Sequence, residues 1–534
     1  MKRTVALSAS VLLVAVALAS LAISALQAES SAREAGRSPL AGPGGADANP
    51  RGEEGPESPG RGGRDARPNI VVIMVDDQAH NTFSRKVQPR TFRHLLDDGG
   101  TAFPRAAAVP PLCCPARAGF QTGQYPHNHG VTSNNYKLLR DPENVLSAWL
   151  KRAGYETGFV GKYMNKYELV RGTRPAPGWD YWWAADGRPD YFDARISDEG
   201  EPYTEKRYLT SATTDRAIEF LRQAQRRRPY FLWLSYYAPH VGRDRSQAAC
   251  PRSAPQVLGR DWRAVRDTRL PRPLSYDERD VADKPAEVRV LPRLDRKARF
   301  RIRRNLLCTK AAMRAVDRGV ARVVREIKRR GEWERTVIVY LSDNGYFFGE
   351  HRIPTGKSRP YREAVEVPFV IRAPKRVLGA APPKRTAALV TNIDLAPTFL
   401  ELAGAEPCIG PGRCRILDGI SLLALLRGED DLRDRAILLE LGPERCRRYD
   451  GVWTAKANYT EWFAEGQGGR CRTTDLEYYD RTRDPHQLHN LLSRRRAVRG
   501  ARVVPGSSEL RRLLGELRGC AGVAGRDQTE RPCA

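Results

Sequence analysis

The stretch PLCCPARAGFQTGQYP, residues 111–126, is the segment around which the rest of the chain is organised. Pro115 suits the first position of a helix, because the N–H group that proline lacks has no partner there. The helix dipole then favours negative charge at Cys113, and Arg117 falls one turn later on the same face. The pattern predicts an anion site that contains a nucleophile. Two buried cysteines at the start of a core helix are the alternative.

Two continuous β-branched runs, residues 69–75 and 336–341, predict strands that are buried on both faces. Oxygen-bearing side chains follow each run, namely Asp76, Asp77, Asp343 and Asn344. Open α/β sheets keep their sites at the carboxyl ends of such strands. We therefore expect a divalent-cation site here, whereas solvated loop caps are the plainer alternative.

Two further strands are predicted over residues 157–163 and 229–235. The first delivers Lys162 at its carboxyl end, and the second is followed by His240. A third ionisable residue, Lys357, lies in a loop after the predicted strand over residues 336–341. Each of these residues alone would be a solvated or structural side chain, so only their combination indicates a site.

The motif Cys-x-Pro-x-Arg, followed by Thr-Gly-x-Tyr-Pro, resembles the signature of type I sulfatases. This resemblance covers residues 68–492 and implies an α/β fold: an alkaline-phosphatase-like sandwich with a large mixed sheet flanked by helices, plus a small C-terminal α+β subdomain. It also implies that a formylglycine-generating enzyme oxidises Cys113 to formylglycine. The implied cation is Ca²⁺, with Mg²⁺ as the alternative, held by Asp76, Asp77, Asp343, Asn344 and the modified Cys113.

The resemblance also implies roles for the charged side chains. Arg117, Lys162 and Lys357 would spread the charge of the sulfuryl oxygens, and His240 would protonate or hydrogen-bond the leaving oxygen. One hydroxyl of the hydrated aldehyde attacks sulfur, and the other then expels sulfate. Met164 stands where many relatives have histidine, so the transfer of roles stops at Lys162 in that segment.

The expected activity is hydrolysis of sulfate monoesters of sulfated amino sugars or glycans. The segment around Lys162 and the loop over residues 125–129 resemble the glucosamine-6-sulfatase and heparan-endosulfatase branch. That loop is expected to place His127 and His129 near the rim of the site. The alternatives are a phosphodiester or phosphonate monoester hydrolase of the same superfamily and a non-catalytic polyanion-binding protein.

The N-terminus is typical of an exported protein, so we expect secretion or a cell-envelope location. Residues 1–28 form a signal-peptide pattern, and an uncleaved membrane anchor over residues 4–26 is the alternative. Residues 29–67 have almost no large apolar side chain and are expected to be a disordered linker. The formal net charge of +27 comes from arginines spread along the whole chain, so no nucleic-acid partner is inferred.

Behind the linker, we expect a catalytic domain over residues 68–430 and a C-terminal small-sheet subdomain and tail over residues 431–534. Residues 242–305 are expected to be irregular, with an amphipathic helix following over residues 311–329. The basic run over residues 296–304 is either a solvated helix face or a contact for a polyanion. Eight of the ten cysteines remain for disulfides, and although 105 connectivities exist, we expect pairs of sequence neighbours: Cys250 with Cys308, Cys408 with Cys414, Cys446 with Cys471, and Cys520 with Cys533.

Overall fold

The computed structural model describes residues 65–187, 189–242, 250–269, 271–443, 445–493, 506–521, 523–524 and 533. The expected signal peptide, the alternative anchor and nearly all of the expected linker lie outside the described residues. In the part of the chain that is described, no helix is both long enough and apolar enough to cross a membrane.

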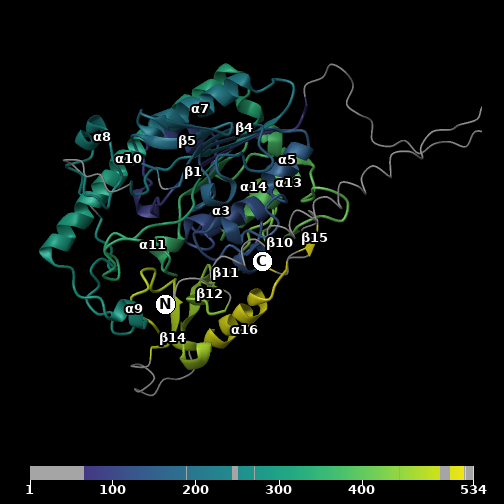
Figure 1. Ribbon diagram of the computed structural model, residues 1–534. Helices are drawn as coiled ribbons and strands as arrows, with labels where there is room; N and C mark the ends of the chain where they lie inside the picture. Colours follow the sequence, from purple (N-terminus) through teal and green to yellow (C-terminus); the bar gives the residue numbers. More distant parts are fainter. Residues whose placement is uncertain are drawn as a thin grey trace, which may run out of the picture. The chain divides into compact units, whose positions relative to one another are not determined.

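A nine-stranded mixed sheet forms the centre of the fold, as the sequence predicts (Figure 1). Its five central strands are parallel, and antiparallel strands complete both edges. In spatial order the strands are β2 (Thr101–Ala102), β9 (Phe369–Arg372), β8 (Thr336–Ser342), β1 (Asn69–Val75), β7 (Tyr230–Ser235), β3 (Glu156–Lys162), β4 (Tyr181–Ala185), β5 (Ala194–Asp198) and β6 (Glu201–Glu205). The strands that were expected to carry the site therefore lie side by side.

Helices cover both faces of this sheet, which explains why β1 is apolar throughout. Ile70 and Val72 pack with residues of α3 (Cys113–Thr122), α5 (Leu146–Arg152) and α13 (Leu395–Ala403) on one face. Val71 and Ile73 pack with α7 (Leu209–Gln223) and α10 (Arg296–Arg329) on the other. Shorter helices connect these elements: α2 (Pro89–Phe92), α4 (Pro126–His129), α6 (Glu168–Arg171), α8 (Gly259–Arg263), α9 (Ala286–Arg289), α11 (Arg362–Val365), α12 (Lys375–Leu378) and α14 (Leu423–Arg427).

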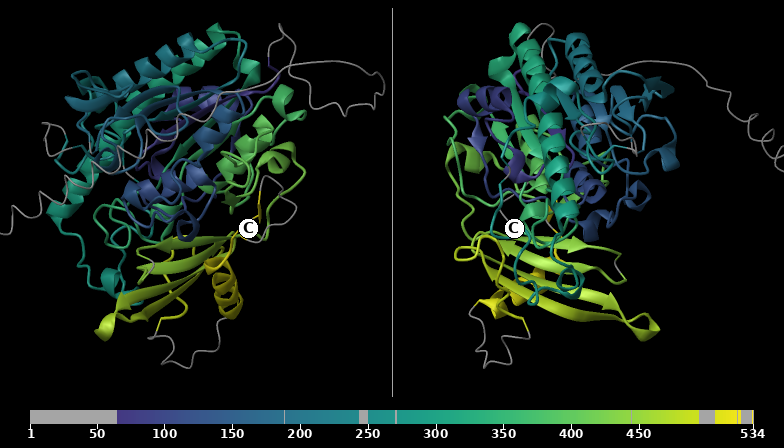
Figure 2. Two further views of the ribbon diagram at one scale, coloured as in Figure 1. Left: turned by 45° about the vertical axis from the view of Figure 1, so that its right-hand side comes forward. Right: turned by 90° about the vertical axis from the view of Figure 1, so that its left-hand side faces the viewer.

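A second, four-stranded antiparallel sheet follows in the C-terminal part of the chain, with a helix packed on it (Figure 2). The small sheet was predicted as a whole, but β13 is difficult to recognise in the sequence. Polar residues of β13 such as Asn458 and Thr460 are buried, so they conceal the alternation that marks a strand. The elements are β11 (Ala436–Leu441), β12 (Tyr449–Thr454), β13 (Ala457–Glu465), β14 (Cys471–Asp480) and α16 (Ser507–Arg518); β10 (Ile416–Leu417) pairs separately with β15 (Val523–Ala524).

The long helix α10 corrects one prediction, because it begins at Arg296 and not near residue 311. The Asp295 side chain caps the helix by accepting a hydrogen bond from the Ala298 N–H at 2.6 Å. Ile302 and Leu306 then continue the buried stripe toward the N-terminus. The surrounding arginines hide that stripe in the sequence, so the expected irregular region ends at residue 295, ten residues earlier than predicted.

The expected local pairing of cysteines is confirmed. The four disulfides are Cys250–Cys308, Cys408–Cys414, Cys446–Cys471 and Cys520–Cys533. Cys113 and Cys114 remain as free, buried thiols. The stretch at residues 111–126 therefore keeps both of its sulfur atoms for chemistry or packing.

Candidate active site

Two neighbouring parallel strands, β1 and β8, end level with one another and bring the predicted oxygen ligands together. The N–H group of Asp77 donates to Asp343 Oδ1 at 3.2 Å. The Asn344 side-chain amide donates to Asp77 Oδ1 at 2.7 Å. Asp76 and the other three residues are at most 4% exposed. The carboxyl ends of β1 and β8 thus form a buried, acidic centre.

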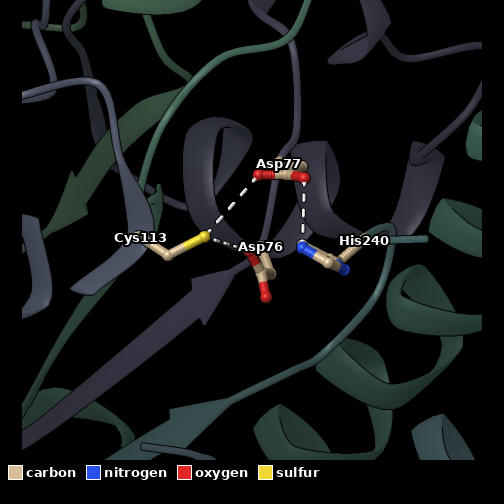
Figure 3. A group of neighbouring side chains, drawn as sticks. All are labelled: Asp76, Asp77, Cys113 and His240. Carbon is tan, nitrogen blue, oxygen red and sulfur yellow. Dashed lines mark hydrogen bonds and ion pairs between the residues drawn. The ribbon is translucent and has the colours of Figure 1, made fainter. Parts of the chain in front are cut away.

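Cys113, the first residue of α3, points into this acidic centre (Figure 3). Its Sγ lies 3.2 Å from Asp76 Oδ1 and 3.9 Å from Asp77 Oδ1. Lys357 Nζ reaches the same sulfur at 2.7 Å and pairs with Asp77. The sulfur is therefore held among two carboxylates and one ammonium group.

Of the two adjacent thiols, only Cys113 has such an environment. Burial, together with the Asp76 carboxylate, raises the pKa of the Cys113 thiol well above its usual range, so a thiolate is disfavoured. The Cys114 Sγ instead faces the backbone carbonyl of Asn165 at 4.0 Å, and burial raises its pKa to about 12. The helix begins two residues earlier than predicted, so Pro115 is its third residue and not its first.

The predicted cations balance the acidic centre from two sides. Lys162, at the end of β3, pairs with Asp76, and Arg117 Nε donates to Asp343 Oδ2 at 2.8 Å. Arg117 is fully buried and also donates to the backbone carbonyl of Lys162 at 2.6 Å and to Ser235 Oγ at 2.8 Å. Ser235 ends β7 and was not predicted as a site residue. Its position at the carboxyl end of a buried strand is the feature from which it could have been predicted.

His240 lies opposite Cys113, with its Nε2 3.7 Å from Asp77 Oδ2 (Figure 3). Its Nδ1 is 2.8 Å from the Val241 carbonyl, which only accepts, so Nδ1 carries the proton and Nε2 faces the site as an acceptor. Burial lowers the pKa of His240 to about 4, so the free site holds a neutral imidazole. The Tyr237 hydroxyl, 2.9 Å from Nδ1, is a neighbour that was not predicted from the sequence.

The donor set fits a hard divalent cation, because it consists mainly of buried oxygens. The Asn344 Oδ1 atom is buried and has no hydrogen-bond partner among the described residues. An amide oxygen of this kind is costly unless a ligand satisfies it. Four residues have ligand atoms that all lie within 4.8 Å of one another: Asp76, Asp77, Cys113 and His240.

The expected position of two histidines near the rim is wrong. His127 is largely buried, and its ring nitrogens lie 2.8 Å from Glu440 Oε1 and 2.8 Å from the Cys520 carbonyl. His129 is fully buried, and its Nδ1 accepts from the N–H of Val131. The His127 imidazole therefore fixes the helix α4 against the C-terminal part of the chain, whereas that of His129 stabilises the turn that follows α4.

Comparison with known proteins agrees with this geometry. The sulfatase family matches residues 68–405, and the family described as N-sulphoglucosamine sulphohydrolase, C-terminal, matches residues 349–502. The chain is 30% identical to human N-acetylglucosamine-6-sulfatase over 399 residues, which cover 70% of this chain and 67% of that protein. It is 36% identical to an extracellular sulfatase SULF-1 homolog of Drosophila melanogaster over 392 residues, which cover 70% of this chain but only 32% of that longer protein.

A solved structure also shares the fold. It is a protein in complex with its substrate, D-glucosamine-2-N,6-O-disulfate, with a TM-score of 0.65 and 24% sequence identity. The likeness covers 85% of this chain and 97% of that one. The predicted alkaline-phosphatase-like sandwich is thereby confirmed. With a matching family model over more than half of its length, the chain belongs to the sulfatase family, as its Cys-x-Pro-x-Arg stretch predicts.

Proposed function

We propose that this chain hydrolyses sulfate monoesters of sulfated amino sugars or related glycans, with a formylglycine made from Cys113. The observation that carries the proposal is the position of the Cys113 sulfur, 3.2 Å from Asp76 and 2.7 Å from Lys357, inside a buried centre. A protonated thiol there is a poor nucleophile, so the unmodified cysteine fits this site less well than a formylglycine that a formylglycine-generating enzyme makes from it.

The oxygen cluster would hold the cation, for which we propose Ca²⁺, with Mg²⁺ as the alternative. The proposed ligands are Asp76, Asp77, Asp343, Asn344 and the modified Cys113. When present, the cation and the hydrated aldehyde would supply a hydroxyl that is nucleophilic near neutral pH and a second hydroxyl that releases sulfate. The protein's own contribution is to keep these groups oriented and shielded from bulk water.

Three cations are proposed to bind the sulfuryl oxygens: Arg117, Lys162 and Lys357. Arg117 cannot turn away, because its other nitrogens are fixed to Asp343 and to a backbone carbonyl. Its Nη2 is buried and has no hydrogen-bond partner among the described residues, which leaves one donor for an anion. Preorganised donors of this kind stabilise charge that develops in the transition state.

His240 is proposed to protonate or hydrogen-bond the leaving oxygen. In the free site its pKa is about 4 and its bare Nε2 faces inward, so it begins as an acceptor. A bound sulfate ester brings negative charge close to the ring and raises its pKa. Protonation of His240 is therefore coupled to substrate binding.

For the substrate we propose a 6-sulfated amino sugar or a related sulfated glycan. The relatives named above are an N-acetylglucosamine-6-sulfatase and an extracellular sulfatase. We further propose export by a signal peptide over residues 1–28, with an anchor over residues 4–26 as the alternative, and a secreted or cell-envelope location. The proposed catalytic domain covers residues 68–430, and the small-sheet subdomain residues 431–534.

Mass analysis of the peptide that contains Cys113 tests the modification, since oxidation to the aldehyde changes its mass. Turnover of N-acetylglucosamine-6-sulfate, an aryl sulfate and a phosphate diester then tests the reaction. We expect the sugar sulfate to be the best substrate and the aryl sulfate a weaker one. Preference for the phosphate diester would establish the alternative phosphodiester or phosphonate hydrolase, and turnover of the aryl sulfate alone would exclude the glycan.

A further inference from the structure

A cavity of about 450 Å³ lies between the first turns of α10 and the segment over residues 267–276. We call it the arginine pocket, because four guanidinium groups and three aromatic rings line it: Arg269, Arg272, Arg299, Arg303, Tyr276, Phe300 and Phe348. The volume falls within the range of small-molecule sites. Phe300 is 61% exposed, so its ring stands at the mouth of the cavity.

Most of the positive charge in the arginine pocket is not neutralised within the protein. Arg299 pairs with Asp277 at 2.6 Å. Among the residues that the structure describes, no carboxylate lies within ion-pair distance of Arg269, Arg272 or Arg303. Two acidic residues also line the cavity: Asp267, which faces Arg266, and the buried Glu350, which accepts the Phe348 N–H. The cavity therefore has an excess of donors for an anion.

The position of these charges along α10 also favours the binding of an anion. Six of the first nine residues of the helix are Lys or Arg, and its first turn has no acidic residue. Cations near a helix N-terminus oppose the helix dipole, so this arrangement does not stabilise the helix itself. An anion bound in the arginine pocket would be favoured by both the side chains and the dipole.

The arginine pocket lies close to the active site. Phe348 in its lining contacts Tyr346, with ring centroids 5.2 Å apart. Tyr346 in turn lies near enough to Asp77 and Lys357 for their charges to act on the pKa of its hydroxyl. Phe348 also belongs to an apolar cluster that joins Ala79 to residues of α10. The arginine pocket and the active site are therefore neighbours, as an oligosaccharide that occupies both requires.

We propose that the arginine pocket binds a second anionic group, a sulfate or carboxylate, on a sugar unit next to the one that is desulfated. This inference rests on the proposed function and extends it, because it makes an oligosaccharide and not a single sugar the preferred substrate. Bidentate guanidinium contacts suit both sulfate and carboxylate oxygens. The remaining volume accommodates the sugar ring against Phe300.

The test compares two double variants of the full chain that remove the same charge. Arg272→Ala with Arg303→Ala changes the arginine pocket, whereas Lys297→Ala with Arg301→Ala changes exposed residues of α10 outside it. Calorimetry with a heparin-derived tetrasaccharide measures affinity in chains that also carry Cys113→Ala and so do not hydrolyse it, and turnover of N-acetylglucosamine-6-sulfate by the same double variants with Cys113 intact measures the reaction. We expect the pocket variant to bind the tetrasaccharide about tenfold more weakly or worse, with monosaccharide turnover unchanged and the control variant like the wild type.

Equal weakening in both double variants would overturn the proposal, because it would assign the binding to diffuse surface charge. Unchanged binding in the pocket variant, or loss of monosaccharide turnover in it, would also overturn it. Failure of the proposed pocket and failure of the proposed sulfatase activity can be told apart, since binding is measured without turnover. A wild-type chain that binds the tetrasaccharide through the arginine pocket but turns over no sulfate ester would refute the proposed function alone.

Discussion

Two buried carboxylate sites in this chain are built on opposite plans. Asp394 receives two hydrogen bonds from the Arg435 guanidinium, both at 2.7 Å, and two more from the backbone N–H groups of Thr391 and Ile420. In the candidate active site, three carboxylates crowd together instead, and Asn344 Oδ1 has no partner among the described residues. Both sites pair their carboxylates with cations, but only the active site leaves an amide oxygen, Asn344 Oδ1, and a guanidinium nitrogen, Arg117 Nη2, without hydrogen-bond partners among the described residues.

The difference separates a structural site from a functional one. The Asp394–Arg435 pair joins a 3₁₀ turn, η5 (Asn392–Asp394), to the residue that precedes β11, so it connects the sulfatase-family region to the C-terminal sheet. Its loss should cost stability. The active-site carboxylates repel one another, so their loss should cost ligand binding and turnover. Four predictions test this contrast.

The largest effect is expected at Cys113. Cys113→Ala removes the group that is proposed to become formylglycine, so turnover should fall below detection, whereas Cys114→Ala should keep most of it. Only Cys113 contacts the carboxylates, and Cys114 faces a backbone carbonyl. Steady-state kinetics on a sulfated sugar measures both variants, with circular dichroism to show that each is folded. Loss of turnover in Cys114→Ala alone would contradict the assignment.

Asp343→Asn should lose the cation and about 10³-fold or more of the turnover, without loss of stability in the metal-free chain. Burial and the neighbouring Asp76 raise the pKa of Asp343 to about 6, so the metal-free fold disfavours its negative charge and loses little when that charge is removed. Metal content after dialysis and thermal unfolding in EDTA measure the two effects. A variant that keeps its metal, or that unfolds several degrees lower in EDTA, would show that Asp343 is structural.

Arg435→Met should have the opposite profile. It leaves the Asp394 carboxylate buried without its partner, which should cost about 3–5 kcal/mol of unfolding free energy, with metal content unchanged. Arg433→Ala is the matched control, since Arg433 is 81% exposed and pairs with the exposed Asp431; it should change stability by less than about 0.5 kcal/mol. Equal effects in the two variants, measured by urea unfolding, would refute the contrast.

The sequence predicts the centre of this molecule better than its borders. The strands that precede Asp76 and Asp343 are nearly continuous apolar runs rich in β-branched residues, as expected of strands that are buried on both faces. The start of α10 was missed because its buried stripe is narrow among arginines. Likewise, the burial of His127 depends on Glu440, more than three hundred residues away, and local sequence carries no sign of such a contact.

The neutral state of His240 could not be predicted for a related reason. The residue type and its place after β7 indicate a site, but its pKa depends on burial and on which nitrogen meets the Val241 carbonyl. The disulfides between sequence neighbours could be predicted, because short loops close with the smallest loss of chain entropy. Contacts between segments that are distant in the sequence were predicted only at the carboxyl ends of parallel strands, where the sheet brings side chains together.

A third buried cluster carries the smallest expected effect. His351 is fully buried, with Nδ1 2.6 Å from Glu278 Oε2 and Nε2 3.7 Å from Glu363 Oε2, and Lys284 pairs with Glu278 at 3.1 Å. As at the Asp394 site, opposite charges face each other here. The cluster differs from that site in that one of its two cations is a histidine, which loses its charge at a lower pH than arginine does.

Burial disfavours the His351 imidazolium, but the hydrogen bond that it donates to Glu278 and the negative charges of Glu278 and Glu363 outweigh burial and raise its pKa to about 9. The charged form is thus favoured in the fold, so its stabilisation is fully present below the unfolded pKa of about 6.5 and is lost as pH rises through 9. The wild-type chain should therefore exceed His351→Gln in unfolding free energy at pH 6, and this excess should shrink by about 3 kcal/mol by pH 10. Urea unfolding of both proteins at pH 6, 8 and 10 measures the excess directly. An excess that stays constant over this range would mean that His351 is neutral in the fold, and that its cluster is held by packing against Tyr361 and not by charge.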